Sequence, residues 1–374
     1  MRPKSKQKDI SRLKIVVTGT RGIPDIQGGV ETHCEELFPR LVRQGLEIVL
    51  IRRSCYISPD NRINEFQGVR LVDLYAPHVK SLEAITHTFL SILWAKRHKA
   101  DIVHIHAIGP GIMTPFARLL GLKVVFTHHG PDYDRKKWGG FAKFILRTGE
   151  KFASKYANEV IVISRVIEEA ILKKFGRTYS HLIFNGVPPP KVTSSFDYIT
   201  HLGLRPRSYV FTLGRFVGEK GFDLLINAFA RLAKNDIKLV IAGDSDHETI
   251  YSRQLKELAL RNGVVLTGFV KGEKLHQLFT HARVFVLPSF HEGLPISLLE
   301  AMSYELPVIV SDIPANKQID LPPERFFTAG DEESLYSRLN FELAGVFNPT
   351  RYDMSQYDWD RIALQTKAVY EKIF

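Results

Sequence analysis

Hydrophobic residues along this chain fall into short β-branched runs that alternate with segments of helical spacing. The first run, residues 14–18, precedes a glycine-rich loop and a helical stretch at 30–44, which Gly45 closes. In the first half, further strands are predicted at residues 47–51, 101–106, 124–127 and 159–163, and helices at 82–96 and 140–157. Such alternation indicates a parallel sheet covered by helices on both faces.

The pattern breaks at residues 185–190, Asn-Gly-Val-Pro-Pro-Pro, which we interpret as a semi-rigid linker. Helices then separate a second series of strands at residues 209–213, 238–242, 264–266, 284–287 and 307–310. The tail at 357–372 shows helical spacing of Ile362, Leu364, Val369 and Ile373. We expect two doubly wound, Rossmann-like α/β domains, residues 1–190 and 191–356, facing a central cleft. The helix at 357–374 is expected to pack back onto the first domain.

Composition and charge narrow the class of protein. With 374 residues, 44% hydrophobic and 24% charged, the chain is not disordered, collagen-like or a disulfide scaffold. Residues 1–190 contain 30 Lys and Arg against 17 Asp and Glu, whereas the remainder contains 21 against 23. The whole excess of positive charge therefore lies in the first half, which we expect to meet an anionic partner: a membrane surface, a phosphate-bearing substrate or nucleic acid.

The sequence predicts a cytoplasmic protein. The basic residues at 1–14 precede only three apolar residues, where a secretory signal needs about 7–15. No segment approaches the roughly 20 apolar residues of a spanning helix. Cys34 and Cys55 cannot form a disulfide framework and are expected to be thiols. Membrane contact is therefore expected only from the surface.

Two short motifs in the second half carry candidate chemistry. Residues 214–221, Gly-Arg-Phe-Val-Gly-Glu-Lys-Gly, follow a strand and lead into a helix predicted at 222–233. Arg215 and Lys220 can add two cations to a helix N-terminus that binds an anion. This is not a Walker A loop, because Gly221 and not Ser or Thr follows Lys220. A solvated loop with incidental charges is the alternative.

The second motif, at residues 289–302, places two glutamates eight positions apart. Glu292 lies in the loop after a strand, Pro295 is expected at the first position of the next helix, and Glu300 lies inside that helix. Carboxylates at these places can accept hydrogen bonds from a sugar and a ribose, and the helix N-terminus favours a diphosphate. Taken alone, two surface glutamates would be the simpler interpretation.

Together the motifs resemble a known family. Arg-x4-Lys followed about seventy residues later by Glu-x7-Glu resembles the retaining glycosyltransferases of family 4, which have the two-domain GT-B fold. The resemblance extends over nearly the whole chain. Residues 18–24, Thr-Gly-Thr-Arg-Gly-Ile-Pro, and 28–32, Gly-Gly-Val-Glu-Thr, resemble the start of a bacterial subgroup of polysaccharide enzymes that includes rhamnosyltransferases.

The resemblance implies transfer of a hexose or deoxyhexose from a nucleoside-diphosphate donor to a saccharide acceptor, with no cofactor beyond that co-substrate. Arg215 and Lys220 match the cations that hold the pyrophosphate and stabilise it as it leaves. Glu300 matches the carboxylate that binds the ribose, and Glu292 the one that contacts and positions the donor sugar without acting as a nucleophile. The donor loop continues through Gly293, Leu294 and Pro295, where many relatives have Gly-Phe-Gly.

In the first half the resemblance assigns Gly28 and Gly29 to the loop that closes near the phosphates and the acceptor. His129 matches the histidine beside the reacting centre, although the adjacent His128 leaves this choice open by one position. The implied catalytic set is His129, Arg215, Lys220 and Glu292. His104 and His106 lie on a predicted strand, and we interpret them as satisfied core or cleft residues and not as metal ligands.

No metal is expected at the donor site. The Asp-x-Asp segments at 132–134 and 244–246 resemble metal motifs, but the cations of the donor motif already supply charge for a diphosphate.

The segment at 135–147 mixes cations with Trp and Phe, as does a helix that lies in a membrane interface. A core-facing helix with a solvated basic face is the alternative, and nucleic acid is disfavoured because no binding motif is present. We therefore expect a polyprenyl-diphosphate-linked acceptor at the inner membrane, where the protein would be peripheral.

Two other functions share this architecture. A sugar-nucleotide 2-epimerase would need no acceptor, and the paired motifs speak against it. A catalytically silent nucleotide-sugar-binding protein would not need to retain Arg215, Lys220, Glu292, Glu300 and a suitable histidine.

Overall fold

The computed structural model describes residues 13–77, 82–131, 139–232, 236–245 and 248–374. The chain divides into two compact units. Unit 1 comprises residues 1–186 and 358–374, and unit 2 comprises residues 187–357. The sequence pattern predicted divisions after residues 190 and 356. In the structure the first division falls after residue 186, and the proline run at 188–190 therefore belongs to unit 2.

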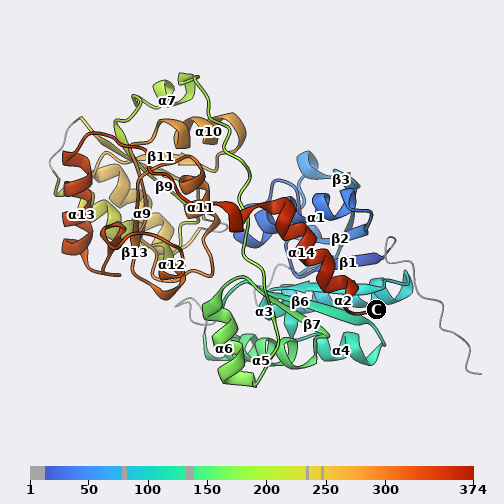
Figure 1. Cartoon of the computed structure of the whole chain (residues 1–374). Helices are drawn as coiled ribbons and strands as arrows, with labels where there is room; N and C mark the ends of the chain where they lie inside the picture. The colour runs from blue at the N-terminus through green and yellow to red at the C-terminus, as the bar shows by residue number, and fades with distance from the viewer. Residues whose placement is uncertain (1–12, 78–81, 132–138, 233–235, 246–247) are drawn as a thin grey trace, which may run out of the picture. The chain divides into compact units, whose positions relative to one another are not determined.

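Unit 1 contains an eight-stranded sheet in the order β3-β4-β2-β1-β5-β6-β7-β8 (Figure 1). All neighbours are parallel except β3 and β4. The strands are β1 (Lys14–Thr18), β2 (Glu47–Arg53), β3 (Glu65–Phe66), β4 (Val69–Leu74), β5 (Ile102–His106), β6 (Lys123–His128), β7 (Glu159–Val162) and β8 (His181–Leu182). Because β2 and β5 flank β1, the strand order reverses beside β1, which is where ligands bind in such sheets.

Helices connect these strands and cover the sheet. They are α1 (Gly29–Arg43), α2 (Glu83–Arg97), α3 (Ile108–Gly111), α4 (Thr114–Leu119), α5 (Gly140–Tyr156), α6 (Arg165–Phe175) and the C-terminal α14 (Trp359–Glu371). Gly45 follows the end of α1 with a φ of 94° and closes it as predicted.

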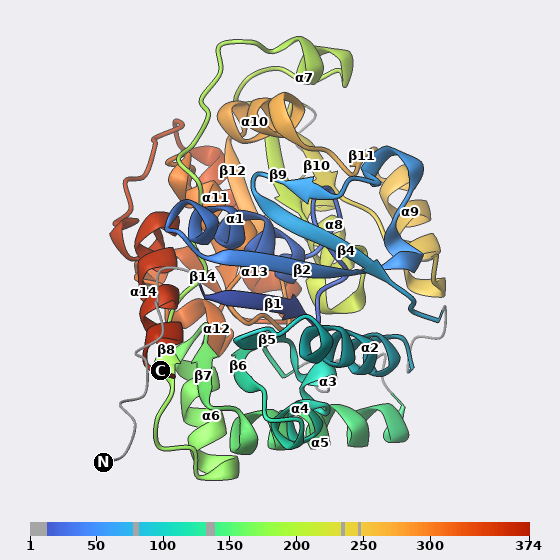
Figure 2. The same cartoon turned by 90° about the vertical axis from the view of Figure 1, so that its right-hand side faces the viewer.

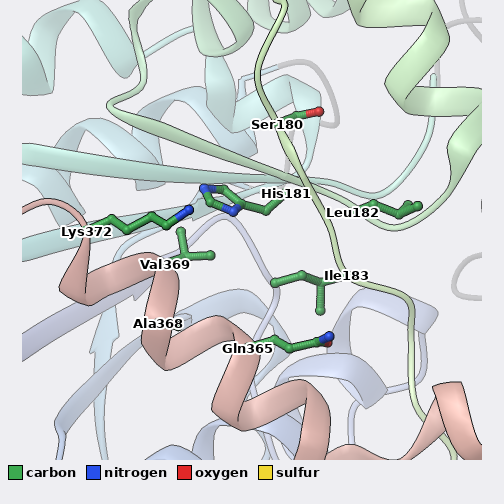
Figure 3. Close-up of a pocket in the computed structure, with 8 residues that line it drawn as sticks. All are labelled: Ser180, His181, Leu182, Ile183, Gln365, Ala368, Val369 and Lys372. Carbon is green, nitrogen blue, oxygen red and sulfur yellow. The ribbon is translucent and has the colours of Figure 1, made fainter.

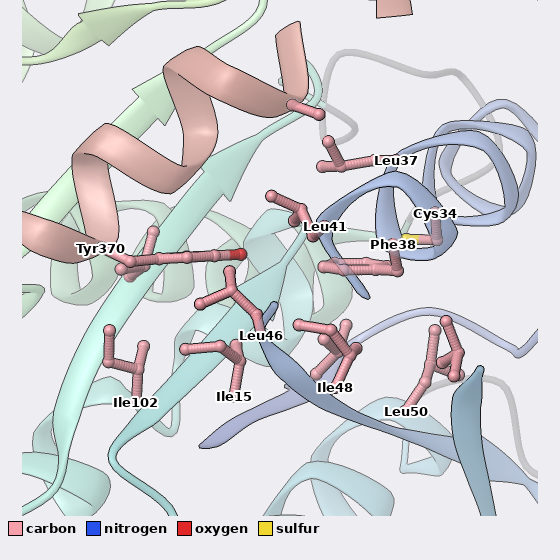
Figure 4. Close-up of a cluster of buried hydrophobic side chains, with 14 of the residues drawn as sticks. Ile15, Cys34, Leu37, Phe38, Leu41, Leu46, Ile48, Leu50, Ile102 and Tyr370 are labelled. Atoms are coloured by element: carbon pink, nitrogen blue, oxygen red, sulfur yellow. The ribbon is translucent and has the colours of Figure 1, made fainter. Parts of the chain in front are cut away.

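Part of the hydrophobic core of unit 1 lies between the sheet and the helices α1 and α14. Figure 4 shows Ile15 of β1, Phe38 and Leu41 of α1 and Tyr370 of α14 gathered there, all buried. The C-terminal helix therefore completes the hydrophobic core of a domain that begins more than 300 residues earlier in the chain. Of the tail residues with helical spacing, Leu364 does not join this core, because its side chain is 60% exposed.

Unit 2 contains a six-stranded parallel sheet in the order β11-β10-β9-β12-β13-β14 (Figure 2). Its strands are β9 (Tyr209–Leu213), β10 (Lys238–Ala242), β11 (Val265–Gly268), β12 (Val284–Leu287), β13 (Val308–Ser311) and β14 (Phe326–Phe327). Its helices are α7 (Asp197–His201), α8 (Phe222–Ala230), α9 (Ile250–Arg261), α10 (Gly272–His281), α11 (Ile296–Ser303), α12 (Pro314–Lys317) and α13 (Glu332–Ala344). In chain order this arrangement is 3-2-1-4-5-6, the order of a Rossmann fold.

Several short elements differ from the sequence prediction. The hydrophobic pattern did not predict the β3–β4 hairpin. β3 is only two residues long, and β4 mixes buried and exposed positions and so lacks the continuous apolar run by which the other strands were identified. Its turn residues Gln67 and Gly68 both have positive φ, as a tight two-residue hairpin requires. Pro295 precedes α11 and is not its first residue, and α8 ends at Ala230, before the predicted 233. Among the described residues, none of the helices combines the length and the apolar character that crossing a membrane needs.

Buried histidines link the stability of unit 1 to pH, and His87 is one of them. His87 lies on α2 and is fully buried. Burial, and secondarily the positive charge of Arg53, lowers the pKa of His87 from 6.5 to about 3. Below pH 6.5 the unfolded chain takes up a proton that the folded chain does not, so the free energy of unfolding decreases as the pH falls towards about 3.

We predict that His87→Leu reduces this loss by up to about 1.4 kcal/mol per pH unit below 6.5. Chemical denaturation at several pH values between neutrality and about pH 4 measures the difference. His201→Leu, at an exposed position on α7, serves as the control and should keep the wild-type slope. Identical pH slopes for His87→Leu and the wild type would contradict the prediction.

Candidate active site

In unit 2 the two sequence motifs lie at the carboxyl ends of adjacent strands. Residues 214–221 follow β9, and residues 288–295 follow β12, which is hydrogen-bonded to β9. The strand order reverses between these two strands, and ligands bind at such a switch point because the loops on its two sides diverge. The topology thus brings together two motifs that are about seventy residues apart in the sequence.

Glycine and backbone hydrogen bonds hold the two loops against each other. Gly221 has a φ of +63°, and a Cβ there would lie 2.3 Å from the carbonyl oxygen of Pro288. The amide of Phe290 donates to the carbonyl of Glu219 at 2.8 Å. A side chain at Gly221 would therefore push the two loops apart.

This close approach places Lys220 beside Glu292. Lys220 Nζ lies 2.6 Å from Glu292 Oε1, and the Ser289 hydroxyl donates to the same oxygen at 2.6 Å. The two charged side chains are only 18% and 11% exposed, so their attraction is little screened by water. The sequence did not single out Ser289 as a ligand of Glu292, although it stands at the start of the second motif.

The other predicted donor residues lie in the same two segments. Arg215 is half-buried in the loop after β9, and Glu300 is half-buried on α11. Leu294 and Pro295 are buried just before α11, and the Gly293 carbonyl accepts a hydrogen bond from Gln318 Nε2 at 3.2 Å. The N-terminus of α11 directs amide groups towards the region after β12, which favours an anion.

Of the two Asp-x-Asp segments, only part of one is described. Asp244 forms an ion pair with Lys256 at 2.8 Å and accepts a hydrogen bond from the Ser245 amide. Asp246 and the whole segment at 132–134 lie outside the described residues.

In unit 1 the glycine-rich loop after β1 passes over the end of β5. Gly19 has a φ of +98°, and a Cβ there would lie 2.2 Å from the carbonyl oxygen of His106. Buried Glu31, in the first turn of α1, accepts hydrogen bonds from the Thr20 hydroxyl at 3.1 Å and the Arg21 amide at 3.0 Å. These contacts fold the loop back onto α1.

The two glycines at the start of α1 differ in what surrounds them. Gly28 has a φ of +155°, and a Cβ there would lie 2.1 Å from Glu31 Oε2. Gly29 is exposed, and a Cβ there would meet no atom within 4 Å. Local packing therefore requires glycine at 28 but not at 29.

The adjacent histidines at the end of β6 have different environments. His128 is buried, its Nε2 lies 2.9 Å from Glu150 Oε1, and its Nδ1 accepts a hydrogen bond from the Gly130 amide. His129 comes directly after the strand and is partly exposed. Its ring is thus the more accessible of the two to a ligand, whereas both ring nitrogens of His128 are engaged.

His129 belongs to a group of histidines that the sequence did not bring together. His106 Nδ1 lies 2.9 Å from His129 Nε2, and the ring centroids of His33 and His129 are 4.9 Å apart. His33 Nδ1 lies 2.9 Å from Asn185 Oδ1. Burial lowers the pKa of His33 to about 4 and holds the pKa values of His106 and His129 well below the usual range. The rings are therefore neutral at neutral pH.

His104 and His106, both predicted to be satisfied residues, differ in whether their ring nitrogens have hydrogen-bond partners. His104 is buried with both nitrogens engaged, Nδ1 at 2.7 Å from the Tyr370 hydroxyl and Nε2 at 2.7 Å from the Thr127 hydroxyl. His106 is also buried, but among the described residues its Nε2 has no hydrogen-bond partner. The prediction missed His33 and Asn185, for which the only sequence signal was proximity to the glycine pair and to the linker.

A surface pocket lies elsewhere on unit 1, between β8 and α14 (Figure 3). Its lining comprises Ser180, His181, Leu182, Ile183, Gln365, Ala368, Val369 and Lys372. None of these is a predicted site residue, and the ring of His181 is bonded to Glu159 at 2.8 Å.

Comparison with known proteins relates both units to one class. Residues 27–191 match the model described as Glycosyltransferase Family 4, and residues 202–337 match that described as Glycosyl transferases group 1. The chain is 26% identical to the uncharacterized glycosyltransferase MJ1607 of Methanocaldococcus jannaschii, with 96% of this chain and 98% of that protein covered.

It is also similar to the UDP-Gal:alpha-D-GlcNAc-diphosphoundecaprenol alpha-1,3-galactosyltransferase of Escherichia coli, with 31% identity over 59% of this chain and 60% of that enzyme. In structure it resembles sucrose-phosphate synthase from Thermosynechococcus elongatus, with a TM-score of 0.82 and 22% identity over 97% of this chain and 99% of the other. Because both units match models of this class and the fold is shared over almost the whole length, the chain belongs to family 4 of the glycosyltransferases, with their GT-B fold of two Rossmann-like domains.

Proposed function

We propose that the protein transfers a sugar from a nucleoside-diphosphate donor to a saccharide acceptor and retains the anomeric configuration. The observation that carries this proposal is the pairing of Lys220 with Glu292 at the strand-order reversal of unit 2. A cation held at a low-exposure position beside a helix N-terminus suits a diphosphate. The name of the Escherichia coli relative, which specifies a UDP-sugar donor, supports the same class of substrate.

In this proposal Arg215 and Lys220 stabilise the charge that develops on the diphosphate as the anomeric bond breaks. Fixed cations in a partly desolvated site provide this stabilisation without reorganising, so a metal ion at the diphosphate is not needed. When the donor binds, its phosphate oxygens compete with Glu292 for Lys220. Glu292 is then available to accept hydrogen bonds from the donor sugar, and Glu300 accepts from the ribose.

Glu292 is assigned to positioning the sugar and not to nucleophilic attack. Its Oε1 accepts a hydrogen bond from the Ser289 hydroxyl, which lowers the nucleophilicity of the carboxylate. Retention is then assigned to attack by the acceptor on the face that the diphosphate leaves, with a phosphate oxygen taking the proton of the acceptor hydroxyl. On unit 1, His129 and the loop at Gly28 and Gly29 are assigned to the reacting centre and the acceptor.

The acceptor is proposed to be linked to a lipid diphosphate. The Escherichia coli relative is named for a diphosphoundecaprenol acceptor, and unit 1 contains the excess positive charge. On α5, Phe141 and Phe144 are 72% and 66% exposed, and Arg147, Lys151 and Lys155 continue along the exposed side. Residues 135–138 of the predicted membrane segment lie outside the described residues. A stripe of exposed aromatic and cationic side chains suits an anionic bilayer surface.

We predict that Lys220→Ala lowers kcat/KM for sugar transfer by about 10²–10³, because it removes a cation that contacts the leaving diphosphate. Glu300→Ala should weaken binding of the nucleoside diphosphate. A thermal-shift screen of nucleoside diphosphates identifies the donor class first, because a ligand of the folded state raises the Tm. Transfer is then measured with the matching nucleotide sugar.

Lys238→Ala provides the matched control. Lys238 is an exposed residue at the opposite, amino-terminal end of β10, so activity and nucleotide binding should stay at wild-type values. Wild-type transfer and donor hydrolysis by both Lys220→Ala and Glu300→Ala would show that the site is wrongly assigned.

The product linkage is expected to have the same anomeric configuration as the donor, since the proposed attack occurs on the face that the diphosphate leaves. The proton coupling constant of the new anomeric centre, measured by NMR, distinguishes the two outcomes. An inverted linkage would overturn the proposed mechanism while leaving sugar transfer itself intact.

We predict that the full chain floats with liposomes containing anionic lipid and that the double variant Phe141→Ala, Phe144→Ala floats several-fold less. Each exposed ring contributes apolar area to an interface, and the nearby cations add roughly 1 kcal/mol each near an anionic surface.

Phe341→Ala is the matched control, because Phe341 on α13 of unit 2 is 76% exposed. This variant should float as the wild type does. Equal recovery of the wild type with neutral and anionic vesicles, or of the double variant and the wild type, would reject this surface as the membrane contact.

A further inference from the structure

Three histidines from three separate segments of unit 1 converge at the end of its sheet. His33 lies on α1, His106 is the last residue of β5, and His129 follows β6. One ring nitrogen from each lies within 4.8 Å of a ring nitrogen from the other two. The centroid of the His106 ring lies 5.7 Å from that of His33 and 5.2 Å from that of His129.

The state of these rings suits coordination. A neutral imidazole offers one lone pair on a ring nitrogen, and the polar contacts of the ring decide which nitrogen carries it. The Oδ1 of Asn185 only accepts hydrogen bonds, and His33 Nδ1 must therefore donate to it. This contact fixes the tautomer and leaves the lone pair of His33 on Nε2, in the way that neighbours of a metal site orient a ligand.

His106 adds an independent observation. Its Nδ1 is bonded to His129, whereas its Nε2 is buried and has no partner among the residues that the structure describes. Buried ring nitrogens are ordinarily hydrogen-bonded. The contacts among the described residues therefore do not explain why the Nε2 of His106 is buried without a partner. Cys34 Sγ also lies near this ring, 3.9 Å from His106 Nδ1.

We propose that His33, His106 and His129 form a binding site for a divalent transition-metal ion of the zinc class. Imidazole nitrogens favour Zn²⁺, Co²⁺, Ni²⁺ or Cu²⁺ over Mg²⁺ and Ca²⁺, which prefer oxygen. At a Zn–N distance of about 2.0–2.1 Å, ligand nitrogens of a tetrahedral ion lie about 3.3 Å apart, so ring nitrogens that lie up to 4.8 Å apart here need to close by up to about 1.5 Å. Three ligands leave a fourth position for water or another small ligand.

Such an ion would tie α1 to the ends of β5 and β6. It would also fix the ring of His129, which lies closest to the exterior of the three. All three ligand residues belong to unit 1, so metal binding can be measured without a nucleotide or an acceptor. The inference therefore does not depend on the proposed transfer reaction.

The test is titration of the purified full chain with Zn²⁺ after treatment with a chelator, by calorimetry, and with Co²⁺ by visible absorption. We expect one equivalent to bind and Co²⁺ to give the intense bands of a four-coordinate site. His33→Gln and His129→Gln should each weaken binding at least about tenfold, since each removes a ligand. Thermal melting without metal shows that each variant is folded.

His181→Gln is the control, because His181 lies on β8 of the same unit and is bonded to Glu159. It should bind one equivalent with wild-type affinity. Absence of one-equivalent binding in the wild type, or unchanged affinity in both folded ligand variants, would overturn the proposal. Nucleoside-diphosphate binding, read in parallel by thermal shift, should be the same in His33→Gln and His181→Gln as in the wild type.

Discussion

Close backbone contact at the carboxyl ends of the strands is the constraint on which both units depend. In unit 1 the loop after β1 lies so near the end of β5 that a Cβ at Gly19 would come within 2.2 Å of a carbonyl oxygen. In unit 2 a Cβ at Gly243 would lie 2.1 Å from the carbonyl oxygen of Gly214, and one at Gly221 would lie 2.3 Å from that of Pro288. Only glycine has both the space and the backbone freedom at these places.

This constraint decides where polar side chains gather. Because the loops after β9 and β12 touch, Lys220 and Glu292 form a pair with little solvent exposure. Because the loop after β1 lies over β5, the backbone of His106 packs beneath Gly19 while its ring meets His129. In each unit the same edge of the sheet thus carries the tight backbone packing and the concentrated chemistry, as the topology of doubly wound sheets favours.

The C-terminal helix shows how a distant segment supports this edge in unit 1. Trp359 packs edge-on against His33, with centroids 5.4 Å apart, and the Tyr370 hydroxyl bonds to His104. A Cβ at Gly186 would lie 2.6 Å from the Trp359 ring, so only glycine fits at the point where the chain leaves unit 1. Through Trp359 and Tyr370, the C-terminal helix therefore contacts His33 and His104 and supports their positions.

The sequence by itself determined the alternation of the longer strands and helices, the proline-rich connection and the two donor motifs, because hydrophobic periodicity and turn residues are local properties. It did not reveal the β3–β4 hairpin or the two-residue strands β8 and β14. The motifs also identified the two loops that contain Lys220 and Glu292. Their pairing, the engagement of both nitrogens of His128, and the meeting of His33 with His106 and His129 came only from the tertiary structure. Such contacts join residues tens to hundreds of positions apart, and strand order and side-chain packing, which no local pattern encodes, decide which of them form.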